Sequence, residues 1–172
     1  MNRDFLTLAE QRFSVRKFSD RPIEQTILEK ILHAGQIAPT ACNKQPQKVF
    51  VLRSKEALEK LRMCTYSHFH APLAILVCYD QTLSWKRDFD GQDSGWVDAS
   101  IVTTHMMLEA WEQGIGSTWI MHFIPEAVRT EFQLPHSFVP VALLVMGYPA
   151  KDASPHPTHT QSKSLDELTY YL

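Results

Sequence analysis

The chain has 172 residues, a formal net charge of −2 and 44% hydrophobic residues, which suits one domain with a buried core. Acidic and basic residues are mixed along the sequence, so no basic stripe indicates a nucleic-acid partner. The longest apolar runs, near 74–77 and 141–146, have the length of strands and are too short to span a bilayer.

Residues 1–10 contain acidic side chains and lack the apolar centre of a signal peptide. The three cysteines, Cys42, Cys64 and Cys78, have no paired spacing. We therefore expect reduced thiols in a cytoplasmic protein, and neither a disulfide framework nor a zinc site.

Two helices are predicted first, and helices and strands alternate after them. Apolar residues spaced three and four apart predict a first helix over residues 4–11 and a second over 24–38. A short strand at 48–52, a polar helix at 55–62 and a strand at 73–79 follow. The strand at 73–79 is nearly continuous in apolar residues, so both of its faces should be buried.

The polar stretch 82–95 is expected to be a loop, and the longest helix follows at 96–113. This helix has two apolar faces, one with Val97, Ile101, Leu108 and Trp111, the other with Val102, Met106 and Ala110. A helix that is apolar on more than one side is buried on more than one side. We therefore expect a homodimer built around this helix, with Val102 and Met106 at the interface between subunits.

Two further strands, at 117–121 and 139–146, enclose a predicted helix at 125–132. From about residue 150 the tail is rich in Pro, Ser, Thr and His and should form an extended arm. The connections between strands do not look like regular parallel units. The pattern therefore indicates a single domain over residues 1–172, of the α+β class, with helices packed around one mixed sheet.

The segment Arg12-Phe13-Ser14-Val15-Arg16 is the first with recognisable chemistry. If it is extended, Arg12, Ser14 and Arg16 point to one side, while Phe13 and Val15 point into the core. Two guanidinium groups flanking a hydroxyl make a receptor for a phosphate or another anion. Taken alone, the segment also fits a solvated basic edge beside a strand.

A second segment, from Pro39 to Pro46, follows the second helix. The carboxamides of Asn43 and Gln45 offer donors and acceptors that suit the pyrimidine edge or the ribityl hydroxyls of a flavin. The alternative is an ordinary loop between helix and strand, in which Asn and Pro are common turn residues.

A third segment runs from Gly114 to His122. Its glycines let a helix end close to the start of a strand, and the residues that leave this strand could present backbone N–H groups to a ring. The spacing is not that of a dinucleotide-binding fingerprint, because the glycines follow a helix instead of a strand. The same residues also fit a helix C-cap followed by a core strand.

In this order, the three segments resemble the motifs of FMN-dependent nitroreductases, and Val145-Met146-Gly147-Tyr148-Pro149 is similar to that family's last strand. The resemblance runs from about Phe5 to Leu168. It implies a three-layer α/β/α sandwich around a mixed, mostly antiparallel sheet, and a homodimer with FMN at its interface. It also implies an oxidoreductase that accepts hydride from NADH or NADPH. Such an enzyme reduces nitroaromatics, quinones or similar small electrophiles in ping-pong fashion.

The resemblance also implies roles for individual residues. The segment Arg12, Phe13, Ser14 would hold the ribityl phosphate, and Arg16 would reach the phosphate or the N1/O2 side of the ring. Asn43 and Gln45 would bond the polar edge of the flavin, with Pro39, Thr40 and Ala41 along the ring or ribityl chain. The N5/O4 edge would face Trp119, Ile120, Met121 and His122, with backbone N–H groups of Met121 or His122 as donors. Lys163 would return to the phosphate. No side chain is expected to be a catalytic nucleophile or acid, because flavin N5 carries the chemistry.

Two departures from the family pattern bear on the substrate. Gln47 stands where many members have an aromatic residue, and the chain is short for the family. Three aromatic residues, Trp85, Phe89 and Trp96, either cover the flavin face or pack locally.

Other functions stay open on sequence grounds. The fold also suits a flavin-storage protein, or a flavin-fragmenting or dehalogenating relative. A dimeric interaction module with a surface basic segment is a further alternative. The histidine pairs His68/His70 and His156/His159 lack a convincing third metal ligand. The expected partners are therefore a second subunit and a small-molecule acceptor, with no metal, nucleic acid or membrane.

Overall fold

The computed structural model describes residues 4–172, so the first three residues of the N-terminal stretch lie outside it. Its strands are β1 (Gln47–Leu52), β2 (Leu73–Asp80), β3 (Gly116–Ile120) and β4 (Phe138–Gly147). Its α-helices are α1 (Phe5–Gln11), α2 (Gln25–Gln36), α3 (Lys55–Cys64), α4 (Gly95–Glu112), α5 (Pro125–Glu131) and α6 (Leu165–Leu168). Two 3₁₀ turns are η1 (Ala41–Asn43) and η2 (Pro157–Thr160).

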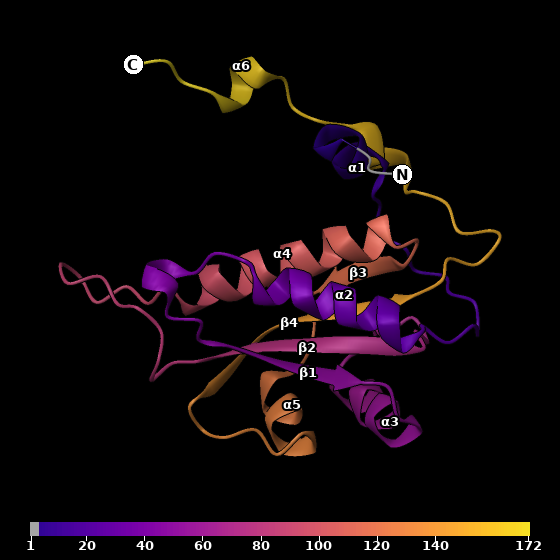
Figure 1. Cartoon of the computed structure of the whole chain (residues 1–172), viewed down its shortest axis with the longest axis horizontal. Coiled ribbons are helices and arrows are strands. Elements are labelled where there is room, and N and C mark those ends of the chain that lie inside the picture. The colour runs from indigo at the N-terminus through magenta and orange to yellow at the C-terminus, as the bar shows by residue number, and fades with distance from the viewer. Residues whose placement is uncertain (1–3) are drawn as a thin grey trace.

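The strands form one sheet in the order β1-β2-β4-β3, and each neighbouring pair is antiparallel. Helices α2 and α4 cover one face and α3 and α5 cover the other, which gives three layers (Figure 1). The α+β class and the sandwich architecture are confirmed. The parallel component of the expected mixed sheet is small. Within residues 4–172 it is a single bridge from Ser14, which lies outside the four strands, to Ser117 of β3.

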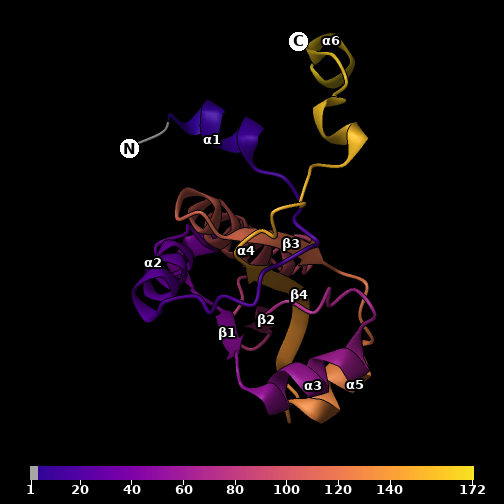
Figure 2. The same ribbon diagram turned by 90° about the vertical axis from the view of Figure 1, so that its right-hand side faces the viewer.

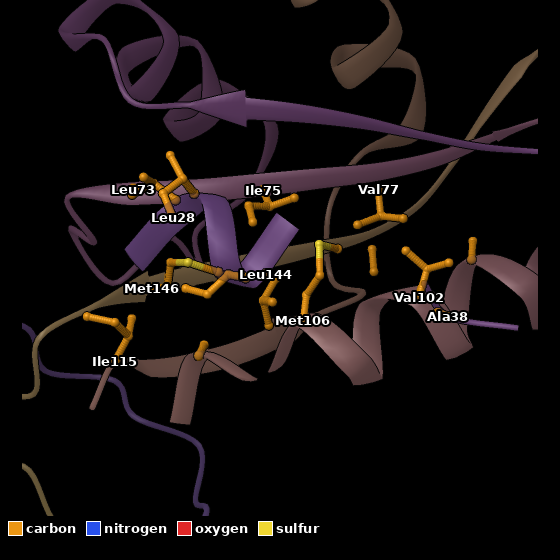
Figure 3. Close-up of a cluster of buried hydrophobic side chains, with 14 of the residues drawn as sticks. Leu28, Ala38, Leu73, Ile75, Val77, Val102, Met106, Ile115, Leu144 and Met146 are labelled. Atoms are coloured by element: carbon orange, nitrogen blue, oxygen red, sulfur yellow. The ribbon is translucent and has the colours of Figure 1, made fainter. Parts of the chain in front are cut away.

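Strand β2 is buried on both faces, as its apolar run predicts, because it lies between β1 and β4 with helices above and below. Its residues Leu73, Ile75 and Val77 join the core beneath α2 and α4 (Figure 3). The alternate residues belong to a second core beneath α3 and α5, together with the fully buried Leu61. The two cores hold the sheet rigidly between the helix layers.

Helix α4 corrects one expectation from the sequence. Val102 and Met106 are fully buried inside the subunit, so placing them at a subunit interface was wrong. Figure 3 shows Met106 pointing from α4 toward the sheet. Gly35 of α2 makes room for it, because a Cβ at that position would meet Met106 Cγ at 2.7 Å. The face that remains open on α4 carries Val97, which is 56% exposed.

The C-terminal arm leaves the sheet at Ala150, whose N–H donates to the Lys17 carbonyl at 3.0 Å. It then runs past α1, where His159 Nε2 lies 3.0 Å from the Glu10 carbonyl oxygen. Beyond η2 the chain continues to α6, which stands apart from the body of the subunit (Figure 2). No helix within residues 4–172 combines the length and the apolar character needed to cross a bilayer.

Replacing Met106 by alanine tests the assignment of the core. The free energy of unfolding should fall by about 2–5 kcal/mol, because a fully buried side chain leaves a cavity. Denaturant unfolding at one fixed protein concentration measures it. The control is Met63→Ala, since Met63 is 71% exposed, and it should change stability by less than about 0.5 kcal/mol. Equal effects from the two variants would contradict the assignment.

Candidate functional site

The segment of residues 12–16 lies along the outer edge of β3. Val15 N–H donates to the Ser117 carbonyl at 3.0 Å, and the Thr118 hydroxyl donates to the Val15 carbonyl. Gly116 permits this approach, because a Cβ there would meet the Val15 side chain at 2.5 Å. Val15 is therefore fully buried, while its neighbours Ser14 and Arg16 remain accessible, as the predicted alternation requires.

The arginines of this segment form no ion pair with the described residues, 4–172. Arg12 is partly buried and forms no ion pair with residues 4–172, and burial lowers the pKa of its guanidinium. Arg16 donates to the Ser14 carbonyl at 3.3 Å and lies 6.0 Å from the centre of the Phe69 ring. A partly desolvated cation without an anion is unfavourable, so the arrangement favours binding of an external anion.

A shallow cleft of about 260 Å³ opens beside Ser14 and Arg16, with the start of the arm, residues 152–157, as its other wall. Lys17 also lines it, paired with Asp152 at 2.6 Å. Because Asp152 pairs with Lys17, Arg16 is the lining cation that stays available to an anion in this cleft. Phe13 packs against Trp111 with ring centroids 5.2 Å apart, which ties the segment to the C-terminal end of α4.

The third predicted segment, residues 114–122, contains β3 and the two residues that follow it. Ile120 is 5% exposed and belongs to the core beneath α3 and α5, so only its backbone is available to a ligand. Trp119 is partly buried, while Met121 and His122 are exposed. Outside the ladder, the N–H groups of Met121 and His122 donate no hydrogen bond to other described residues. Residues 12–16 and 119–122 thus share one surface.

The loop after α2 has a strained backbone and is held by internal hydrogen bonds. Cys42, Asn43 and Gln45 have φ values of 49°, 51° and 48°, in the left-handed region that residues other than glycine rarely adopt. Gln45 N–H donates to Thr40 Oγ1 at 3.0 Å, and Gln45 Nε2 donates to Asn43 Oδ1 at 2.9 Å. Pro39, Asn43 and Gln45 are exposed, and Thr40 and Ala41 are partly buried. The loop therefore presents its polar groups in one fixed arrangement.

Asp98 anchors this loop and is not among the residues that the sequence motifs indicate. Asp98 lies in the first turn of α4 and is 2% exposed. Its carboxylate accepts from the Ala41 N–H at 2.9 Å and from the Ser94 hydroxyl at 2.7 Å. An acidic residue near a helix N-terminus is a visible signal, but its partner lies 57 positions away in the sequence.

Within one subunit, the predicted site residues form two separate groups. The loop of residues 39–45 is anchored by Asp98 at the N-terminal end of α4, while Phe13 contacts Trp111 near its C-terminal end. At 1.5 Å per residue, these anchor points lie about 20 Å apart along α4. Lys163 belongs to neither group, because it is exposed on the arm and has no hydrogen bond or ion pair with residues 4–172.

The comparisons with known proteins fit this geometry. The model of the nitroreductase family matches residues 9–69 and 60–148, which together are most of the chain. The chain belongs to the nitroreductase family. The family assignment made from the three segments is thereby confirmed.

Three relatives of this nitroreductase chain illustrate the similarity. A nitroreductase family protein of Clostridium difficile 630 superposes with a TM-score of 0.92 and 43% identity, covering 99% of this chain and 98% of its own. An FMN-dependent nitroreductase of Clostridium difficile has a TM-score of 0.76 and 27% identity, covering 88% and 91%. A Methanothermobacter thermautotrophicus protein, whose name combines NADH dehydrogenase and NAD(P)H nitroreductase, is 32% identical over 87% of this chain and 79% of its own.

The cysteines of this nitroreductase are unpaired. Cys42 is exposed, whereas Cys64 and Cys78 are buried. Burial raises the pKa of Cys64 to about 11 and that of Cys78 to about 12. Both buried thiols therefore stay protonated at neutral pH and are poor nucleophiles.

The anchoring role of Asp98 can be tested by Asp98→Ala. Hydrogen exchange at the Ala41 amide should become about tenfold faster or more, because this N–H loses its acceptor. The matched control is Asp93→Ala, since the Asp93 carboxylate accepts from the Gly95 N–H at 2.7 Å at the same helix start, without a hydrogen bond to residues 39–45. Exchange measured by NMR decides the question. Equal acceleration in both variants would mean that the start of the helix, and not Asp98, holds the loop.

Proposed function

We propose that the protein is an FMN-dependent NAD(P)H oxidoreductase whose flavin site is completed by a second copy of the chain. The observation that carries this proposal is the partly buried Arg12, which has no counter-ion among residues 4–172, beside Ser14 and Arg16 at the edge of β3. Such a cluster suits the terminal phosphate of FMN. The names of two relatives, an FMN-dependent nitroreductase and an NAD(P)H nitroreductase, support the same cofactor and donor.

The other residues fit the remaining parts of FMN. The exposed carboxamides of Asn43 and Gln45 offer donors and acceptors to the polar edge of the ring. The free N–H groups of Met121 and His122 suit its N5/O4 side, and Lys163 is proposed to return to the phosphate. When bound, FMN supplies hydride transfer at N5. The chain's own residues bind, orient and cover it.

A second subunit is needed because the two groups of residues lie about 20 Å apart along α4. One flavin touched by both groups must take residues 12–16 from one subunit and residues 39–45 from the other. The open face of α4 offers an interface for this pairing. It carries Trp96 and Val97, 43% and 56% exposed, beside a shallow groove of about 430 Å³. A two-fold related copy would bury this surface on both chains.

Two further features favour the dimer. The end of the arm exposes apolar side chains, with Leu165 78%, Leu168 62% and Tyr170 85% exposed, which suits packing on the second copy. Phe89 is 96% exposed at the tip of a rigid turn, held by the Arg87–Asp90 ion pair at 2.6 Å. This turn lies at the same end of α4 as the 39–45 loop, where Trp85 and Ala41 line one cavity. Phe89 is thus positioned to cover the flavin of the partner.

We propose nitroaromatics or quinones as acceptors, in a cytoplasmic enzyme with reduced thiols. The sequence carries no Gly-rich dinucleotide motif, so donor and acceptor should use the same site in turn. The purified protein should be yellow, lose its flavin absorbance on anaerobic addition of NADH or NADPH, and regain it with a quinone. Steady-state plots should be parallel. A colourless protein that takes up no FMN would refute the proposal, and bound FMN without turnover would indicate flavin storage.

Replacing Arg12 by alanine should weaken FMN binding by about tenfold or more, because a charge-assisted bond to phosphate is lost. Titration of the apoprotein, followed by flavin fluorescence, measures the affinity. Arg53→Ala is the control, since Arg53 is exposed and bonds only Gln25, at 2.8 Å. An unchanged affinity in Arg12→Ala would mean that the phosphate lies elsewhere.

The interface is tested by Val97→Asp, which places a charge on the open face of α4. The dimer should dissociate and release FMN in the same concentration range, because each site needs both chains. Sedimentation velocity and flavin fluorescence follow the two events. Val97→Ile keeps the surface apolar and should retain both. A wild-type monomer that binds FMN tightly would contradict the two-subunit site.

A further inference from the structure

A cavity of about 450 Å³ opens directly beside His122. One wall consists of residues 62–66, at the end of α3, and the other of residues 122–124, just before α5. Two hydrogen bonds join these walls. The Thr65 hydroxyl donates to the His122 carbonyl at 2.5 Å, and the Ile124 N–H donates to the Cys64 carbonyl at 2.9 Å. The cavity is therefore formed before any ligand binds.

The walls of this cavity are unusually apolar for a surface feature. Met63, Tyr66 and Ile124 are 71%, 92% and 58% exposed, and all three line it. Apolar side chains gathered around an opening indicate a ligand site more often than chance exposure does. The Cys64 thiol in the wall is buried and its pKa is raised to about 11. Because this protonated thiol is a poor nucleophile, the cavity suits reversible binding of a flat, apolar group.

One cation lines the cavity without an internal partner. Arg62 forms no ion pair with residues 4–172, whereas Lys60 of the same helix pairs with Glu56 at 2.8 Å. The helix dipole stabilises a cation near a helix C-terminus. The N–H donors of the Arg62 guanidinium nevertheless stay available to bind a ligand.

Two histidines lie close to Arg62. His68 and His70 lie together, with ring centroids 4.5 Å apart. The pKa of His68 is lowered first by burial and then by the positive charges of His70 and Arg62, which places these groups close to one another. Glu131 of α5 is an acidic group near the cavity wall, since its negative charge also raises the pKa of Cys64. Because the lowered pKa makes protonation of His68 less favourable, Arg62 is the lining residue that supplies a permanent positive charge.

We infer that this cavity selects aromatic acceptors that carry a carboxylate, with Arg62 binding the carboxylate and the ring lying against Met63, Tyr66 and Ile124. The inference rests on the proposed function and specifies its substrate class. Its position suits this role, because His122 is both a wall of the cavity and part of the proposed flavin edge. Small-ligand sites span about 300–1,000 Å³, so this volume fits a compact acceptor better than a whole dinucleotide donor.

The test compares two substrates of nearly equal shape, 4-nitrobenzoate and 4-nitrobenzamide, with the holoenzyme and NADH. In Arg62→Gln, kcat/KM for 4-nitrobenzoate should fall by about tenfold or more through KM, because a charge-assisted bond is lost. For 4-nitrobenzamide it should change by less than about twofold. Arg53→Gln, which removes an exposed arginine bonded to Gln25, should leave both substrates unaffected.

Calorimetric titration of the same two ligands into oxidised wild type and Arg62→Gln gives a readout that needs no turnover. Preferential binding of 4-nitrobenzoate by wild type, lost in the variant, is the expected result. Equal losses for both ligands, or a rise only in KM for NADH, would overturn the inference. Missing FMN or missing turnover with a neutral quinone would instead defeat the proposed function, and the titration would still decide whether Arg62 selects carboxylates.

Discussion

The length of helix α4, which is buried on the side that faces the sheet, determines how far apart the polar groups of one subunit lie. Helix α4 packs against α2 and the sheet through side chains such as Met106, so neither of its ends can move independently. Asp98 fixes one loop near its start, and Trp111 holds the N-terminal segment near its end. The fold thus separates the two groups of polar residues by a distance that no side-chain rotation can bridge. In the proposed dimer, a two-fold axis would bring opposite ends of two such helices together.

The arginine segment shows how a site can be held without regular secondary structure. Residues 12–16 are not part of the four-stranded sheet, yet Val15 is as buried as any residue of β2. The missing side chain of Gly116 makes this possible, since any larger residue would push the segment away from β3. Burial of Val15 fixes the register of Ser14 and Arg16, which leaves their polar groups facing outward. The apolar contact therefore determines the geometry of the charged groups.

The periodicity of apolar residues predicted the helices and strands well, but it predicted less well which of them pack together. Each helix and strand inferred from residue spacing exists, with ends shifted by one or two residues in most cases. The alternation in residues 12–16 and the double burial of β2 were equally visible, because local pattern determines both. The two apolar stripes of α4 were both visible as well, but which of them faces the sheet depends on Gly35 of a distant helix. The bond from Ala41 to Asp98 and the cavity beside Arg62 join segments far apart in the sequence. No local pattern could reveal them.

The strained loop after α2 has a consequence for the behaviour of the protein on warming. Three residues other than glycine in the left-handed region, Cys42, Asn43 and Gln45, lower the energy needed to release that loop. The buried residues of the two hydrophobic cores lie in regular strands and helices for the most part, so the cores should persist to higher temperature than the loop does. Heat inactivation should therefore begin while the circular dichroism of the sheet and helices is still native. The temperature at which this protein stops working would then be set by a few turn residues, and not by the melting of its core.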